Sequence, residues 1–279
     1  MSTSFTKPSG PARIMVWSTP RSVSTALARS MSARGDTEMF WEPYLTCYNF
    51  GPKQNARRFL KTPDEESMFD AKYTYSYISG LLNNEYPGAK VIFAKCMVEG
   101  IRDDFSVVER NFKHSFLIRH PKKAFRSMTR LMKSVSLDQN LVEHPYVNIY
   151  DDLERFYRYV ESALDQPAPP IIDADDLVSQ PEKLLSKYCD SMGIAYTPKM
   201  LEWESVDASQ LNWHCADAGA MAHAQISQSL LLSNALKGVG FGKAPDLTGD
   251  DVEIPPHLEE IIENSLPAYE KLYALRIKP

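Results

Sequence analysis

Small hydroxylated residues surround one proline and one arginine near the start of the sequence. The stretch STPRSVST, residues 18–25, lies between the apolar run at residues 14–17 and a helix-like pattern that begins at Ser24. Hydroxyls and free backbone N–H groups donate hydrogen bonds to anions, and Arg21 adds a permanent charge with a planar fork of donors. A loop between a strand and a helix also meets the positive end of the helix dipole. This stretch therefore predicts a phosphate or sulfate site.

The loop differs from the nucleotide-kinase loop G-x-x-x-x-G-K-[ST], because it has no glycine and carries Arg21 in place of the lysine. The hydroxyl donors would come from Ser22, Ser24 and Thr25. The alternative interpretation is a capped turn, in which Ser22 or Ser24 is the helix N-cap and Arg21 is solvated.

A second segment repeats the order of strand, arginine, proline and helix. In HSFLIRHPKKAFRSM, residues 114–128, Arg119 ends the strand and Ser127 lies eight residues later, early in the next helix. The two side chains can converge on one phosphate at the crevice where α/β sheets bind ligands. Two anion sites predict a ligand with two anionic groups. In the alternative interpretation, Arg119 pairs with a surface carboxylate and Ser127 faces solvent.

The elements that must position these residues follow from the alternation of short apolar runs with amphipathic segments. Strands are predicted at residues 12–17, 37–41, 90–97, 114–120 and 169–177. Helices are predicted at residues 24–33, 64–83, 122–134, 151–164 and 181–192, with a last helix from about Pro256. The order predicts an α/β fold of three layers, with a mainly parallel central sheet flanked by helices. We expect one domain over residues 1–279, with residues 204–279 as a helical and loop-rich C-terminal cap.

Composition limits the possible partners. The 279 residues are 43% hydrophobic and carry a formal net charge of -5, which argues against a surface devoted to nucleic acid or to a membrane. The sequence has no long apolar window and no signal-peptide pattern at its start, which predicts a cytoplasmic protein. Its 4 cysteines are scattered and its 6 histidines lack ligand spacing, so reduced thiols and no metal site are expected.

Together, the two arginine-containing segments resemble those of the sulfotransferase family, P-loop-like enzymes that use 3'-phosphoadenosine 5'-phosphosulfate (PAPS). STPRSVST looks like the family's 5'-phosphosulfate loop, and IRHPKKAFRS looks like its 3'-phosphate segment. The stretch at residues 170–194 is similar to the strand and helix that follow in the family, and LKGVGFGK is loosely similar to its C-terminal K-G loop. The resemblance implies that PAPS, and the product PAP, contact Arg21, Ser22, Val23, Ser24, Thr25, Arg119, Ser127, Lys237 and Gly238.

The sequence departs from the family at three places. Val23 stands where many members have glycine, and its β-branched side chain predicts a negative φ. Lys95, Cys96 and Met97 stand where the cytosolic small-molecule branch has K-T-H, so no histidine base is expected there. The dimer motif of that branch is absent, which leaves a homo-oligomer possible but without support.

Sulfuryl transfer to an alcohol needs a proton acceptor and a positive charge near the leaving oxygen. Glu42, in FWEPY, is the predicted base, because it follows the second strand and resembles the catalytic glutamate of other sulfotransferase branches. Alternatively, it caps the turn before Pro43. Arg21 would act electrostatically on the transferred group, and Lys95 would assist unless it is a plain surface cation. His120 is expected to point away from the site.

The expected function is transfer of a sulfuryl group from PAPS to a hydroxyl or amine of a small-molecule acceptor, without a metal. One alternative is a P-loop kinase or NTPase that holds Mg²⁺ through Asp173 or Asp175. Another is a catalytically inert nucleotide-binding protein. Aromatic residues between 44 and 77 either line an acceptor pocket or belong to the core, so the sequence leaves open the acceptor and whether the product keeps the sulfate.

Overall fold

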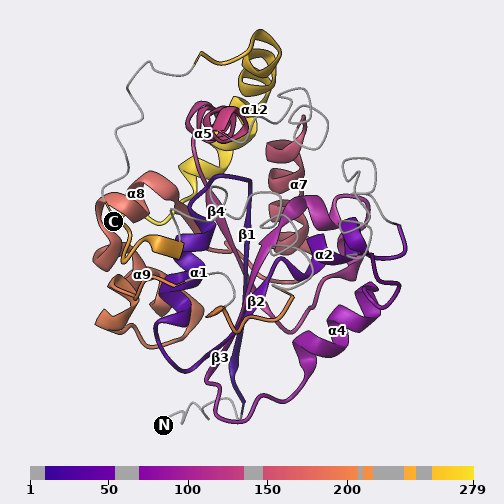
Figure 1. Cartoon of the computed structure of the whole chain (residues 1–279), viewed down its shortest axis with the longest axis vertical. Helices are drawn as coiled ribbons and strands as arrows, with labels where there is room; N and C mark the ends of the chain where they lie inside the picture. The colour runs from indigo at the N-terminus through magenta and orange to yellow at the C-terminus, as the bar shows by residue number, and fades with distance from the viewer. Residues whose placement is uncertain (1–9, 54–68, 135–146, 207–209, 216–235, 243–252) are drawn as a thin grey trace.

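The computed structural model describes residues 10–53, 69–134, 147–206, 210–215, 236–242 and 253–279. In these segments, parallel strands form one sheet with helices on both faces, as Figure 1 shows. The sheet has the order β2-β3-β1-β4-β5. Its strands are β1 (Ala12–Ser18), β2 (Thr37–Trp41), β3 (Val91–Met97), β4 (Lys113–Ile118) and β5 (Ile171–Asp173).

The helices form the two outer layers. One face is covered by α1 (Ser24–Ser32), α8 (Ala174–Ser179) and α9 (Pro181–Met192). The other face is covered by α2 (Pro43–Phe50), α4 (Tyr75–Asn83), α5 (Pro121–Ser134), α7 (Ile149–Ala163) and α12 (Pro256–Ala274). Short 3-10 turns lie at Val98–Ile101, Phe105–Val107 and Pro198–Leu201.

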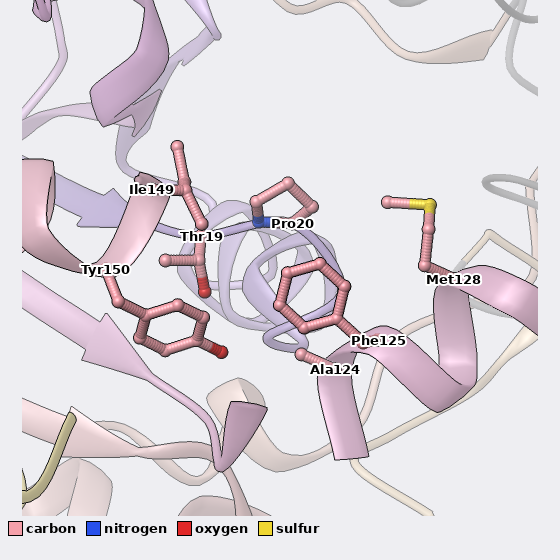
Figure 2. Close-up of a pocket in the computed structure, with 7 residues that line it drawn as sticks. All are labelled: Thr19, Pro20, Ala124, Phe125, Met128, Ile149 and Tyr150. Carbon is pink, nitrogen blue, oxygen red and sulfur yellow. The ribbon is translucent and has the colours of Figure 1, made fainter. Parts of the chain in front are cut away.

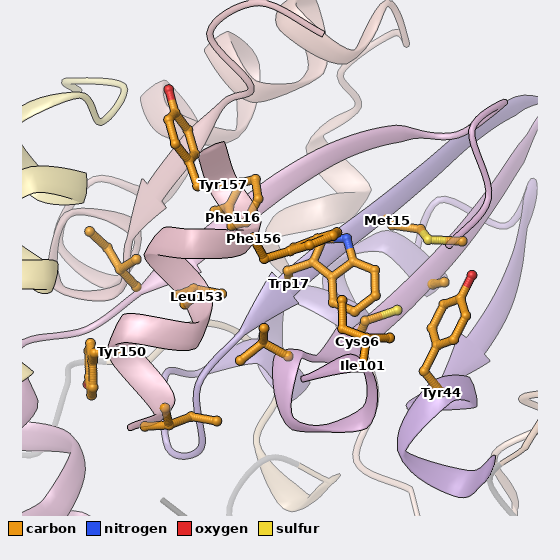
Figure 3. Close-up of a cluster of buried hydrophobic side chains, with 14 of the residues drawn as sticks. Met15, Trp17, Tyr44, Cys96, Ile101, Phe116, Tyr150, Leu153, Phe156 and Tyr157 are labelled. Atoms are coloured by element: carbon orange, nitrogen blue, oxygen red, sulfur yellow. The ribbon is translucent and has the colours of Figure 1, made fainter. Parts of the chain in front are cut away.

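The strands are buried on both faces, which explains their nearly continuous apolar sequence. Neighbouring residues of a strand point to opposite faces, so Ile14 and Val16 of β1 contact the layer of α1 and α9. Met15 and Trp17 contact the opposite layer, where the Trp17 ring lies 4.6 Å from that of Phe156 on α7 (Figure 3). Two cores, one on each side of the sheet, therefore hold the carboxyl ends of the strands in fixed positions.

The strand order creates a crevice between β1 and β4. These strands are neighbours, but the chain leaves β1 through α1 toward β2, and leaves β4 through α5 and α7 toward β5 on the other side. Two connections that leave in opposite directions open a gap at the carboxyl ends of the strands, where α/β sheets bind ligands. The loops that follow β1 and β4 are the two segments singled out in the sequence.

The predicted three-layer α/β fold with a parallel sheet is confirmed, and each predicted strand is present. The strand predicted at residues 169–177 ends at Asp173, because the Asp173 carboxylate accepts hydrogen bonds from the backbone of Asp175 and Asp176 and begins α8. The short helices α2 and α8 were not predicted.

The helix predicted at residues 64–83 is present over residues 75–83 and is wrong over residues 69–74. Residues 64–68 lie outside the described segments, and residues 69–74 are not helical. Helix α4 begins at Tyr75, because the Thr74 side chain accepts a hydrogen bond from the Tyr77 backbone and starts the helix there.

Parts of residues 204–279 pack closely on the sheet layers. Leu258, Tyr269 and Leu272 of α12 belong to the same core cluster as Trp17. The C-terminal cap beginning at residue 204 stays a prediction. No helix in the described segments combines the length and apolar character that a membrane span needs.

Further backbone contacts lie along both edges of the sheet. At β2, the Trp41 N–H donates to the His214 carbonyl and the His214 N–H donates to the Met39 carbonyl, each at 2.9 Å. At β5, the Ile277 N–H donates to the Ile171 carbonyl at 2.9 Å.

Candidate active site

The loop after β1 has an unusual backbone. Arg21 has φ 62° and Val23, the N-cap residue of α1, has φ 59°, so both are left-handed. The prediction of a negative φ for Val23 is therefore wrong. Left-handed residues with side chains cost about 1 to 3 kcal/mol each and persist where surrounding contacts fix them. Here the Ser22 hydroxyl donates to the Thr19 carbonyl at 2.7 Å and closes the turn.

The N-terminal end of α1 supplies the other expected donors. Ser24 is the buried first residue of the helix, and Thr25 is half-buried in its first turn. The first N–H groups of a helix have no partners within the helix, so they are free to bind a ligand. The capped-turn interpretation fails in one respect, because the N-cap is Val23 rather than Ser22 or Ser24.

The two arginine-containing segments meet at the crevice. The Arg21 Nε donates to the Ser127 hydroxyl at 3.1 Å, joining residues 106 positions apart. The Arg119 Nη1 donates to the Arg21 carbonyl oxygen at 2.8 Å across 98 positions. The arginine and serine of the second segment thus contact the side chain and the backbone of the same residue in the first.

Arg119 is a buried cation, only 6% exposed. Desolvation by this burial lowers the pKa of Arg119, while the nearby Asp175, Tyr150 and Asp173 act in the opposite direction. Its Nε is buried and has no hydrogen-bond partner among the described residues. The Asp175 carboxylate is paired with Lys123 at 2.6 Å. Arg119 therefore retains a buried donor that an incoming anion would satisfy.

Glu42 lies where β2 passes into α2. It has φ 46° and ψ 47°, a left-handed residue between the last strand residue Trp41 and Pro43, the first residue of the helix. Its backbone N–H donates to the Lys95 carbonyl at 2.7 Å. A sharp strand-to-helix turn of this kind holds a side chain at the carboxyl end of a sheet, and a strained residue there suggests a functional role.

The Glu42 carboxylate accepts a hydrogen bond from the Lys95 ammonium group in an ion pair. Lys95 stands opposite Trp41 in the strand register, and its Nζ lies 4.5 Å from the centre of the Trp41 ring. Its side chain is 4% exposed and that of Glu42 is 18% exposed. Lys95 is therefore not a plain surface cation.

A small, mostly apolar pocket adjoins the first loop (Figure 2). It lies between the loop, α5 and the start of α7 and is partly open to solvent. Its lining residues are Thr19, Pro20, Ala124, Phe125, Met128, Ile149 and Tyr150. Because Pro20 precedes Arg21, the pocket lies beside the proposed anion site.

Lys237 and Gly238 lie in a segment that pairs with residues 202–206. The Val206 N–H donates to the Leu236 carbonyl at 3.1 Å and the Trp203 N–H donates to the Val239 carbonyl at 3.2 Å. Lys237 is exposed, and in the described structure no hydrogen bond or ion pair joins it to the first loop.

The His120 side chain packs against helix α12. Its ring lies 5.3 Å from that of Tyr269 on α12, in an edge-to-face arrangement.

The carboxylates proposed for Mg²⁺ have other partners. Asp173 is 1% exposed and accepts hydrogen bonds from the Asp175 and Asp176 backbone and from the Tyr269 hydroxyl. Burial raises the pKa of Asp173. Within the described segments, no cluster of three potential metal-ligating side chains is found. Asp173 therefore caps a helix, and Asp175 pairs with Lys123.

Sequence reasoning missed Tyr150 and Trp213. The Tyr150 hydroxyl donates to the Arg119 carbonyl at 2.7 Å, and the Trp213 ring lies 5.5 Å from the Trp41 ring in a stacked arrangement. Neither belongs to a motif, and both approach the site from distant parts of the chain, so no local signal could have identified them.

Several known proteins are similar to part of this chain. A branched-chain-amino-acid aminotransferase-like protein 2 from Arabidopsis thaliana is 30% identical over 194 residues, which are 69% of this chain and 32% of that protein. Sulfotransferase ppzF from Metarhizium majus is 21% identical over 210 residues, which are 70% of this chain and 60% of that protein. The chain thus spans about a third of the length of the first curated relatives that it matches.

The fold has a counterpart among solved structures. The sulfotransferase from Alicyclobacillus acidocaldarius superposes with a TM-score of 0.52 at 13% identity, covering 96% of each chain. The model of the sulfotransferase domain family matches residues 12–251, a range that includes both arginine-containing segments, Glu42 and Lys95. The chain therefore belongs to the sulfotransferase domain family.

Proposed function

We propose that this chain transfers a sulfuryl group from PAPS to a hydroxyl or amine of a small-molecule acceptor. The observation that carries the proposal is the meeting of Arg21, Ser127 and Arg119 at the carboxyl ends of β1 and β4. Membership in the sulfotransferase domain family supports the type of reaction.

PAPS has two anionic groups and supplies an activated sulfuryl group, with PAP as the remaining product. Arg21, Ser22, Val23, Ser24 and Thr25 are proposed to hold the phosphosulfate through side chains and the N–H groups at the start of α1. Arg119 and Ser127 are proposed to hold the 3'-phosphate, since the Arg119 Nε is a buried donor without a partner in the described structure. Lys237 and Gly238 are proposed as further nucleotide contacts.

Glu42 is proposed to take the proton from the acceptor. Lys95 donates to its Oε1 and orients the carboxylate, which leaves Oε2 as the oxygen that receives the proton. An arginine side chain carries a permanent positive charge, so the proposed role of Arg21 is to stabilise the negative charge that develops as the sulfuryl group is transferred.

The apolar pocket is proposed to receive the hydrocarbon part of the acceptor. Pro20 and Met128 line it beside Arg21, and its lining is mostly apolar. We propose the cytoplasm as the compartment, which the free state of Cys47, Cys96, Cys189 and Cys215 supports.

The test is an incubation with PAPS that carries a radioactive sulfuryl group and a panel of hydroxylated and amino compounds. The expected result is a labelled product, or a dehydrated one if sulfate acts as a leaving group. PAPS binding in calorimetry without any turnover would favour an inert nucleotide-binding protein. Binding and hydrolysis of ATP with Mg²⁺, in the absence of PAPS binding, would favour the kinase alternative.

A further inference from the structure

We propose that Arg119 is a positioning residue for the first loop as well as a ligand for the 3'-phosphate. This inference rests on the proposed function, and it assigns to one guanidinium group the role of joining the two anion sites. The consequence is that binding at the 5' end of the nucleotide depends on Arg119, even for a nucleotide that lacks a 3'-phosphate.

Arg119 donates a hydrogen bond to the backbone of the first loop. Its Nη1 donates to the Arg21 carbonyl oxygen at 2.8 Å, and Arg21 is one of the left-handed residues of the loop. A trans peptide is planar and holds C=O and N–H antiparallel, so fixing the Arg21 carbonyl also fixes the direction of the Ser22 N–H. Arg119 therefore determines how one backbone donor of the anion loop is oriented.

The backbone conformation of the first loop costs free energy. Arg21 and Val23 are both left-handed, and such residues persist only where the surrounding structure fixes them. The Arg21 side chain is held separately, because its Nε donates to the Ser127 hydroxyl at 3.1 Å. The second segment thus fixes the backbone and the side chain of Arg21 independently.

Arg119 is itself held in place by burial and by a hydrogen bond to its backbone. Its side chain is 6% exposed, and its carbonyl oxygen accepts a hydrogen bond at 2.7 Å from the hydroxyl of Tyr150, which is 1% exposed. Arg119 follows β4, and Tyr150 of α7 binds its backbone. The position of the Arg119 side chain, and with it that of the loop, is therefore fixed by these two elements. The Arg119 Nε is left without a partner among the described residues, available to a 3'-phosphate.

A protease test reads the loop without any ligand. Trypsin cleaves after arginine, and the bond after Arg21 contains the carbonyl that Arg119 binds. We expect Arg119→Ala to raise the rate of cleavage between Arg21 and Ser22 about tenfold under native conditions, measured by mass spectrometry. Lys123→Ala is the matched control. It also removes a cation at the start of α5, but Lys123 pairs with Asp175. Equal cleavage rates in the two variants would overturn the proposal.

A binding test uses 5'-AMP, which has no 3'-phosphate, and PAP, which has one. We expect Arg119→Ala to weaken 5'-AMP about tenfold and PAP by a larger factor, and to lower kcat at saturating PAPS about tenfold or more. Unchanged 5'-AMP affinity and unchanged kcat, with weaker PAP binding alone, would show that Arg119 is only a phosphate ligand. Guanidinium ion added to Arg119→Ala is expected to restore part of kcat, which a merely structural role would not permit.

A milder variant covers the case in which Arg119→Ala does not fold. Tyr150→Phe removes only the hydroxyl that holds the Arg119 backbone. We expect the rate of cleavage after Arg21 to rise, and 5'-AMP affinity and kcat to fall, by about two- to fivefold each. A folded Tyr150→Phe protein with wild-type cleavage and kcat would contradict the proposal. A wild-type protein that binds no nucleotide, yet is protected at Arg21 in an Arg119-dependent way, would refute the proposed function and leave the positioning role standing.

Discussion

Lys95 of β3 forms a partly buried ion pair with Glu42, the left-handed residue that joins β2 to α2. The pair spans neighbouring strands, because Lys95 lies opposite Trp41 in the register and Glu42 follows directly. A buried charge needs such a partner, since the desolvation of either ion alone is costly. The pair therefore orients the proposed base and binds two strands together.

Glu42→Gln keeps the shape of the side chain and removes the proton acceptor. We expect turnover to fall by about 10² to 10⁴ while PAPS affinity changes little, as measured by steady-state kinetics and calorimetry. Glu38→Gln, at the opposite end of β2, is the control and should keep its activity. Near-wild-type turnover in Glu42→Gln would transfer the role of base to another group, with Lys95 tested next.

Lys95→Met leaves the Glu42 carboxylate without its partner. We expect a loss of about 2 kcal/mol in the free energy of unfolding, less than for a fully buried pair because Glu42 is 18% exposed. The double variant with Glu42→Gln should be less destabilised than the sum of the single variants, as measured by urea denaturation. Strict additivity would show that the two side chains are not coupled.

Val23→Gly removes the side chain that opposes a left-handed backbone. We expect the free energy of unfolding to rise by about 0.5 to 1 kcal/mol, because relief of the strain exceeds the added entropy of the unfolded chain. The prediction concerns stability alone, because Val23 belongs to the loop proposed to hold the phosphosulfate. Ala26→Gly, three residues later inside α1, is the control and should lower stability by about 1 kcal/mol. Destabilisation by Val23→Gly would mean that the valine side chain contributes more by packing than it costs in strain.

His114 makes stability depend on pH. Its Nδ1 accepts a hydrogen bond from the Trp17 indole at 3.0 Å, and its Nε2 lies 3.0 Å from the Glu109 carbonyl. Burial lowers the pKa of His114 from 6.5 to about 4, so the ring is neutral in the folded protein. Between pH 4 and pH 6.5, the imidazole is protonated in the unfolded chain but not in the folded protein. The contribution of His114 to the free energy of unfolding is therefore fully present above pH 6.5, and it is lost progressively as the pH falls toward 4.

Urea denaturation at about pH 7.5 and about pH 5 measures this effect, with a loss on the order of 2 kcal/mol expected from His114. His114→Gln should remove that part of the pH dependence, and the difference between the two proteins isolates it from the carboxylates. An identical pH dependence in both proteins would contradict the neutral, buried imidazole.

Removal of divalent metal is expected to leave turnover unchanged. A transferring sulfuryl group carries less charge than a phosphoryl group, so Arg21 and the N–H groups at the start of α1 suffice to stabilise it. The measurement is turnover in EDTA, with and without added Mg²⁺. Loss of turnover that Mg²⁺ restores would favour the kinase alternative.

The sequence singles out the two segments proposed to bind anions, because each combines strand, arginine, hydroxyl and helix within a short stretch. Their partnership is not local. The contact between Arg119 and Arg21 joins residues 98 positions apart and exists only because β1 and β4 are neighbours, which composition and periodicity do not determine.

The backbone of Val23 shows that a local preference, although correctly read from the sequence, can be overridden by the surrounding structure. Its β-branched side chain correctly indicates a preference for negative φ, but contacts within the loop and from Arg119 hold the neighbouring residues and override that preference. In the same way, the apolar surroundings of Glu42 could be read from FWEPY, whereas its ion pair required the register of β2 against β3.

The backbone contacts at His214 and Ile277 have a consequence for association between molecules. An open strand edge offers unpaired N–H and C=O groups to any other chain, and this is a common route to aggregation. Here the β2 edge is paired with the backbone of His214, and the β5 edge receives the N–H of Ile277. Both margins of the sheet are thus partly occupied by the chain's own backbone, which disfavours growth of the sheet from one molecule into the next.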